Sequence, residues 1–68
     1  MKQIELMEIA LKYIEKGYDG EDLRYGDDLY DATPEDKEQC IEYFYECKKI
    51  GTEAFAAKIA ELSKTNTL

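Results

Sequence analysis

Three stretches of the chain repeat apolar residues at the three- and four-residue spacing of an amphipathic helix. In the first stretch, about residues 3–16, the apolar stripe consists of Ile4, Met7, Leu11 and Ile14, and it is widened by Leu6, Ala10 and Tyr13. Gly17 follows where a left-handed residue commonly ends a helix, and Tyr18 is placed to fold back over the last turn. This stretch is therefore predicted to be a helix that ends in a Schellman-type cap.

The clearest start and stop signals flank the second stretch, residues 34–50. Thr33 offers a hydroxyl that can cap a helix, and proline suits the first helical position, which Pro34 occupies. The apolar side of the stretch consists of Cys40, Ile41, Tyr43, Phe44, Cys47 and Ile50. Two lysines lie at the negative end of the helix dipole, and Gly51 is expected to end the helix.

A third helix is expected over about residues 53–64, with Thr52 as its cap. Its buried stripe is predicted to be Phe55, Ile59 and Leu62, and the alanines between these residues raise helix propensity. Residues 65–68 are expected to fray. Because no stretch alternates like a strand, the fold class predicted is all-α: a small three-helix bundle in a single domain, residues 1–68.

The connection between the first two helices, residues 19–32, is long for a structureless loop in so small a domain. Its apolar residues indicate one or two short helical turns, and they are Leu23, Tyr25, Leu29 and Tyr30. Gly26 is expected to break these turns, and Asp19 can cap the first of them. The apolar side chains are expected to anchor the connection to the core.

All of the net charge of the chain lies in residues 19–38. This stretch has nine acidic and two basic residues, whereas the rest of the chain has seven of each, so the net charge of −7 comes from the stretch alone. Solubility needs only an even spread of charge, and crowded carboxylates destabilise a fold by repulsion. The stretch is therefore either a solvated connector or a surface for a basic partner. Its acidity disfavours direct contact with nucleic acids or anionic membranes.

A chain of 68 residues buries only about 60 % of its unfolded surface, so marginal stability is expected. Cys40 and Cys47 lie about 10 Å apart along a helix axis, too far for a disulfide within the chain. Free thiols in a reducing cytoplasm are predicted, with a bridge between two chains as the alternative. The absence of a signal sequence or long apolar run predicts a soluble chain.

Residues that usually carry out catalysis are scarce. The chain has no histidine, which removes the usual general base and the usual activator of a cysteine. A window that starts at Asp27 places oxygens at four positions of a calcium loop, but Leu29 and Ala32 replace a ligand and the required glycine. No enzyme activity, cofactor or metal site is predicted, and a weak calcium-responsive domain is kept as an alternative.

Tyrosines stand among the acids of residues 18–38, and tyrosine provides a large contact area at low rotamer cost. Carboxylates around such rings steer a protein towards a basic patch, with strong salt dependence. The residues predicted to contact a partner are Tyr18, Asp19, Glu21, Asp22, Tyr25, Asp27, Asp28, Tyr30, Asp31 and Glu35.

The expected partner is a protein that handles nucleic acids, because most strongly basic grooves belong to such proteins. A compact acidic domain can occlude such a groove as a nucleic-acid mimic, by placing carboxylates where phosphates would lie. Small inhibitors of nucleases and of CRISPR or restriction complexes, carried by phages and mobile elements, act in this way. The sequence favours a binding inhibitor of this anti-defence kind. The alternative is an oligomeric structural or adaptor module that packs through the third helix or the Cys40–Cys47 face.

Overall fold

The computed structural model describes residues 1–66, and all regular structure in this range is helical. The elements are α1 (Gln3–Glu15), α2 (Gly20–Arg24), the 3-10 turn η1 (Asp27–Leu29), α3 (Pro34–Ile50) and α4 (Thr52–Asn66). The predicted all-α class is confirmed. The connection contains α2 and η1, which correspond to the one or two short helical turns expected there. The described residues thus form four α-helices where three were expected.

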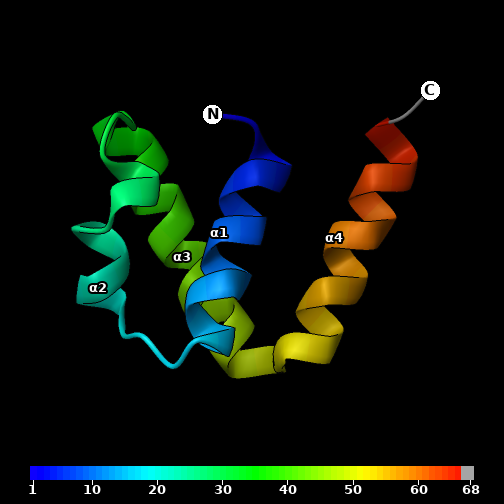
Figure 1. Ribbon diagram of the computed structural model, residues 1–68. Coiled ribbons are helices and arrows are strands. Elements are labelled where there is room, and N and C mark those ends of the chain that lie inside the picture. Colours follow the sequence, from blue (N-terminus) through cyan, green and yellow to red (C-terminus); the bar gives the residue numbers. More distant parts are fainter. Residues whose placement is uncertain (67–68) are drawn as a thin grey trace.

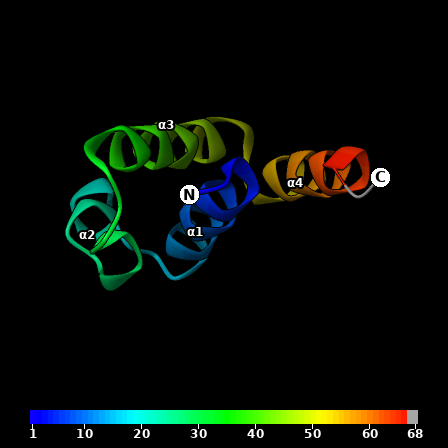
Figure 2. The same ribbon diagram turned by 90° about the horizontal axis from the view of Figure 1, so that it is seen from above.

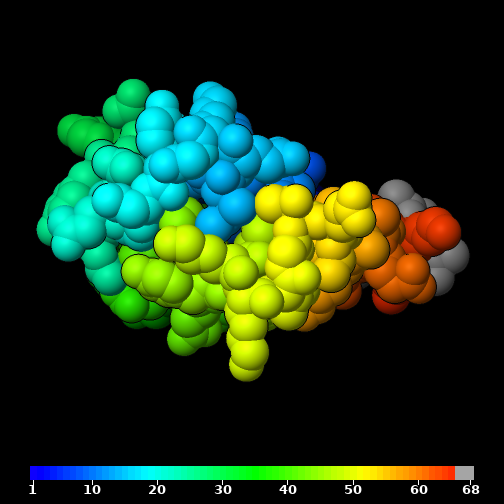
Figure 3. Space-filling model, turned by 90° about the horizontal axis from the view of Figure 1, so that it is seen from below, coloured from blue at the N-terminus to red at the C-terminus, as the bar shows by residue number. Residues whose placement is uncertain are grey.

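The two longest helices, α3 and α4, form the arms of a V, and α1 lies between them (Figure 1). α1 packs against both arms, whereas α2 packs against α3. Seen from above, α2 and α4 lie at opposite ends of the molecule (Figure 2). The principal extents are 32 × 23 × 15 Å, and the space-filling view shows α4 projecting from the rest (Figure 3). The molecule therefore has two separate ends built on a shared centre.

The end of α1 is the predicted Schellman cap. Gly17 has a φ of +80°, and the N–H of Tyr18 donates to the carbonyl of Tyr13 at 3.0 Å. The N–H of Gly17 donates to the carbonyl of Ile14, also at 3.0 Å. The rings of Tyr13 and Tyr18 lie 5.3 Å apart between centroids, which is the side-chain contact that accompanies such caps. This cap turns the chain towards α2.

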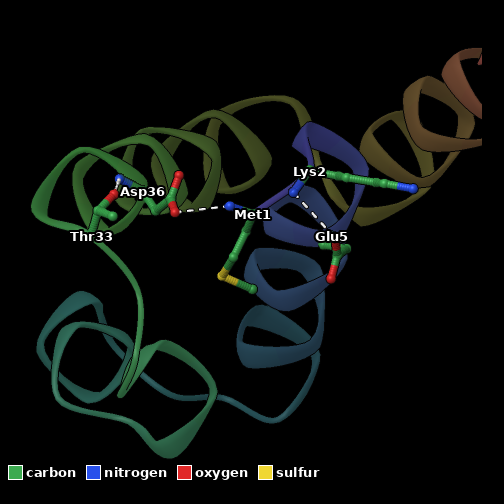
Figure 4. A network of polar contacts seen from close by, with 5 residues as sticks. All are labelled: Met1, Lys2, Glu5, Thr33 and Asp36. Carbon is green, nitrogen blue, oxygen red and sulfur yellow. Dashed lines mark hydrogen bonds and ion pairs between the residues drawn. The ribbon is translucent and has the colours of Figure 1, made fainter.

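The starts of α1 and α3 lie side by side and are joined by polar contacts (Figure 4). The N–H of Asp36 donates to Oγ1 of Thr33 at 3.1 Å, as the cap prediction requires. Oδ2 of Asp36 lies 3.0 Å from the amino group of Met1, and these contacts lower the pKa of the carboxyl. At the start of α1, the N–H of Lys2 donates to Oε1 of Glu5 at 3.1 Å.

The junction between α3 and α4 is a single glycine. Gly51 has a φ of +97°, and its N–H donates to the carbonyl of Cys47 at 2.8 Å. Its own carbonyl accepts from Phe55 at 3.0 Å, so Gly51 holds the cap position that was expected for Thr52. α4 continues to Asn66, so the fraying expected at residues 65 and 66 is wrong, and that expected at 67 and 68 lies outside the described residues.

The buried core has two clusters that share α1. The first joins α1, α2, η1 and α3 through Leu6, Ala10, Tyr13, Leu23, Leu29, Cys40, Ile41 and Phe44. The second joins α1, α3 and α4 through Met7, Cys47, Phe55 and Ile59. Apart from Leu23 and Leu29 of the connection, the core residues belong to the predicted stripes. Other stripe residues are only partly buried, and they are Ile4, Leu11, Ile14, Tyr43 and Leu62. Ile50 is 41 % exposed, because it lies in the last turn of α3 beyond the reach of α1.

Both cysteines are free, and their side chains are fully buried. Sγ of Cys40 lies 3.3 Å from the carbonyl oxygen of Leu6, to which its S–H donates. Burial raises the pKa of the Cys40 thiol to about 12, and burial also raises the pKa of the Cys47 thiol. A disulfide to a second chain would therefore require the core to open. No helix in the described part of the chain is both long and apolar enough to cross a membrane.

Candidate functional site

The short helix α2 starts with a reciprocal pair of aspartates. The N–H of Asp22 donates to Oδ1 of Asp19 at 2.9 Å, and the N–H of Asp19 donates to Oδ2 of Asp22 at 3.0 Å. Hydrogen bonding to these backbone groups lowers the pKa of Asp19. Asp19 therefore caps the first turn as predicted. Two of the acids expected to contact a partner thus also hold the backbone in place.

Two leucines anchor residues 19–32 to the core. Leu23 of α2 and Leu29 of η1 are both fully buried in the first cluster. The tyrosines expected to help them do not: Tyr25 is 78 % exposed and Tyr30 is 80 % exposed. In such short turns one buried side chain per turn is enough, and the neighbouring tyrosines then face water. The prediction that these two tyrosines are anchors is wrong.

Gly26, between α2 and η1, allows a close approach to α1. A Cβ at this position would collide with the hydroxyl of Tyr13 and would lie 2.9 Å from the carbonyl oxygen of Asp22. Any larger residue would therefore push η1 away from α1. The break expected at Gly26 is confirmed, and the glycine is required by space, not by a positive φ.

Asp28 fastens η1 to α1. Its Oδ1 lies 2.9 Å from Nζ of Lys12, and the hydroxyl of Tyr13 also interacts with the carboxylate. These partners lower the pKa of Asp28, with Lys12 contributing most. Burial, together with the nearby Asp28, raises the pKa of Tyr13 to about 12. A second ion pair, from Nη1 of Arg24 to Oε1 of Glu38 at 2.7 Å, joins α2 to α3.

An open hollow of about 400 Å³ lies where the end of α1 meets α2 and η1. Its lining residues are Tyr13, Tyr18, Asp22, Tyr25, Gly26 and Asp27. Four of the predicted contact residues are therefore brought together: two tyrosines and two aspartates. The ring of Tyr18 is 47 % exposed, so both predicted tyrosines offer ring surface to a partner. The carboxylate of Asp27 has no hydrogen bond or ion pair within residues 1–66.

The other predicted contact residues do not line the hollow. Asp19 and Asp28 are engaged within the fold, as described above. The remaining side chains are exposed and carry no hydrogen bond or ion pair to another described residue: Glu21, Tyr30, Asp31 and Glu35. Of the ten predicted contact residues, four therefore line the hollow, two make contacts within the fold, and four are exposed outside the hollow.

Some residues of this end were missed from the sequence. Tyr13 was assigned only to the stripe of α1, and its place in the hollow follows from how η1 packs. Tyr45 is 56 % exposed, and its ring packs edge-on against Phe44 at 5.3 Å between centroids. A Cβ at Gly20 would lie 2.6 Å from the hydroxyl of Tyr45, so α2 passes directly over this ring. The sequence does contain one indication that Tyr45 is exposed, because this residue lies outside the apolar stripe of its helix.

The site can bind a cation through ring faces and carboxylates, which attract positive groups. In the part of the chain that the structure describes, no three His, Cys, Asp or Glu side chains come together to hold a metal ion. The calcium-responsive alternative gains no support, because Glu38, the twelfth position of its window and one of the four oxygen positions, is paired with Arg24. Comparison with models of protein families, with curated proteins and with solved structures found no match to this chain.

Proposed function

We propose that the protein is an acidic binding module that docks on a basic surface of a nucleic-acid-handling protein and occludes that surface. The observation that carries this proposal is the hollow, in which exposed Tyr18 and Tyr25 lie beside the unpaired carboxylate of Asp27. This hollow belongs to the end of the molecule that carries all of the net charge. Apolar ring surface and free negative charge are thus offered at one place.

The acids of residues 19–38 divide into two groups. Five are engaged within the fold, and they are Asp19, Asp22, Asp28, Asp36 and Glu38. Four have no ion pair or side-chain hydrogen bond within residues 1–66, and they are Glu21, Asp27, Asp31 and Glu35. The second group can meet basic groups of a partner without breaking an internal contact. Their mutual repulsion is then relieved in the complex, which favours association at low salt.

The exposed tyrosines supply the non-electrostatic part of the binding energy. Tyr25 and Tyr30 keep most of their surface in contact with water, and an aromatic side chain can bury about 150–250 Å². At about 25 cal/mol per Å², each ring can contribute several kcal/mol before the costs of association. A steering field of carboxylates with aromatic anchors suits an inhibitor that occupies a phosphate-binding groove. An anti-defence inhibitor from a phage or mobile element would act in this way.

The test compares the wild type with a variant in which the unpaired acids are neutralised: Glu21→Gln, Asp27→Asn, Asp31→Asn and Glu35→Gln. The control is Glu53→Gln with Glu61→Gln on α4, which removes the two acids of that helix and leaves the acidic end unchanged. Each protein is immobilised and exposed to a nuclease-treated host lysate at low and at high salt, and the bound proteins are identified by mass spectrometry. A purified partner is then tested for loss of its nucleic acid when the module is added.

The proposal expects a basic partner that the wild type and the α4 control capture at low salt and the neutralised variant does not. The wild type should also displace nucleic acid from that partner. Equal capture by the neutralised variant would contradict the proposal, and so would a partner that keeps its nucleic acid. Circular dichroism checks that both variants keep their helix content.

The oligomeric alternative named two surfaces for contact with a second copy, and one of them is buried inside the fold. The Cys40–Cys47 face is not available to a second copy, because both side chains are buried under α1, and Cys47 also packs with Phe55 of α4. The exposed alanines of α4 remain as the other surface. An oligomer formed there would show a mass that rises with concentration and changes little with salt.

A further inference from the structure

The hollow at the acidic end is lined by two kinds of chemical group, aromatic rings and carboxylates. Rings of Tyr18 and Tyr25 form one kind, and the carboxylates of Asp22 and Asp27 form the other. No basic residue lines it, and the lysines Lys12 and Lys16 close by both act on the carboxylate of Asp28, with which Lys12 is paired. The lining therefore carries two negative charges beside aromatic faces.

Both carboxylates have free acceptor capacity. Asp22 uses only Oδ2 in the cap of α2, so its Oδ1 accepts no hydrogen bond from the described part of the chain. Asp27 uses neither oxygen. A cation that enters the hollow can thus be bound without loss of an internal hydrogen bond, and α2 keeps its cap.

We infer that the hollow takes the guanidinium group of an arginine side chain that projects from the basic partner. This inference rests on the proposed function and names the group that the partner inserts. A guanidinium can stack its flat face on a tyrosine ring while its edge donates to a carboxylate, so it satisfies both kinds of group at once. An ammonium group is a compact, strongly hydrated charge that lacks this planar edge, so lysine fits less well.

The size of the hollow and contacts elsewhere in the molecule agree with this ligand. A volume of about 400 Å³ lies near the lower end for ligand sites, which suits one long side chain better than a large molecule. The chain also places cations over rings internally: Nζ of Lys12 lies 5.8 Å from the ring centroid of Tyr13, and Nζ of Lys48 lies 5.6 Å from that of Phe44.

The test is an NMR titration of the full chain with N-acetyl-argininamide at constant ionic strength, with N-acetyl-lysinamide as the comparison. The signals followed are the ring protons of Tyr18 and Tyr25, and those of Tyr45 serve as an exposed reference outside the hollow. We expect saturable shifts at Tyr18 and Tyr25 only. The arginine compound should bind at least about threefold more tightly than the lysine compound.

Two variants make the test specific to the hollow. Asp27→Asn and Tyr25→Ala should each weaken binding of N-acetyl-argininamide at least about threefold, whereas Glu53→Gln on α4 should leave it unchanged. Equal, linear shifts at all three tyrosines would overturn the inference, and so would equal binding of the lysine compound or an unaffected Asp27→Asn protein. Tyr25 and Asp27 are exposed, so neither substitution opens the core.

Failure of this inference can be separated from failure of the proposed function. Suppose that a partner is captured through Asp31 and Glu35 while N-acetyl-argininamide fails to bind. This result would refute the binding of arginine in the hollow and leave the proposed function intact. If N-acetyl-argininamide binds but no basic partner is captured, the hollow is supported as a site for arginine. The proposed function, occlusion of a partner's basic surface, is then refuted.

Discussion

The two ends of the molecule are attached to the same centre but carry different surfaces. α4 is attached through Phe55 and Ile59, and the acidic end through Leu23 and Leu29, all of them buried against α1 and α3. α4 contains two acids and two bases, whereas all of the net charge lies in residues 19–38. Because each end is attached through two buried apolar side chains, the attachment does not by itself require net charge, and the four unpaired acids of residues 19–38 are not explained by it.

The exposed apolar side chains show the same contrast. Over residues 52–65 of α4 the exposed positions are alanine, charged residues and one threonine, and no large apolar side chain is exposed. The acidic end exposes three tyrosines, Tyr18, Tyr25 and Tyr30. Exposed rings surrounded by carboxylates bring no advantage to a solvated connector. A docking surface, in contrast, is expected to have this composition. The comparison therefore favours a function located at the acidic end.

The largest effect is expected from Phe44→Ala, which removes a large aromatic side chain from the first core cluster, between α1, α2, η1 and α3. The side chain is fully buried, and deletion of a core aromatic commonly costs on the order of 3 kcal/mol. A chain of this size has a free energy of unfolding of only about 3–10 kcal/mol, so much of the protein should unfold. Thermal and urea unfolding followed by circular dichroism measure the change. Glu42→Ala, at an exposed position of α3, is the control, and an unchanged melting temperature for Phe44→Ala would mean that α3 is packed the other way round.

The parts of this structure that the sequence predicts are those with a local cause. α3 begins at Pro34, directly after the capping hydroxyl of Thr33, and it ends at Ile50, directly before Gly51, since each of these signals acts within one turn. The same holds for the cap at Gly17, where Tyr18 folds back on the turn that precedes it. These contacts depend on neighbours in sequence, so a single sequence is enough to predict them.

The parts that the sequence does not predict depend on contacts between distant residues. Pairing of Lys12 with Asp28 and of Arg24 with Glu38 engages two of the acids within the fold, and no local pattern indicates either pair. The exposure of Tyr25 was missed because a five-residue helix has too few positions to show which face is apolar. Four predicted contact residues do meet in the hollow, yet its shape depends on the approach of η1 to Tyr13.

An intermediate effect, confined to one end, is expected from Leu29→Ala. Removing this fully buried side chain should cost about 2 kcal/mol, near the lower limit for such substitutions because the short turn η1 can partly collapse into the space. Hydrogen exchange should accelerate at the amides of α2 and η1 and remain slow in the middle of α4. Binding of N-acetyl-argininamide should weaken as well. Equal acceleration in both ends would show that the acidic end is not a separate unit.

The smallest effect is expected from Asp28→Asn, which removes the ion pair between η1 and Lys12 of α1. The pair with Lys12 is partly exposed, so it should contribute less than about 1 kcal/mol. Because folding lowers the pKa of Asp28, its contribution is present above the pKa of an unfolded aspartate, about 3.9, and is lost as the pH falls through the folded value. The stability difference between wild type and variant should therefore be constant near neutrality and vanish in acid.

Asp31→Asn is the control for this pH dependence, because it removes an exposed carboxylate that has no ion pair within the described residues. Its loss relieves repulsion among the acids, so we expect stability near neutrality to stay equal or to rise slightly at low salt. The two substitutions should then act in opposite directions on the same segment, although each removes one negative charge. A matched loss of stability in both would mean that net charge, and not the contact between Asp28 and Lys12, holds η1 against α1.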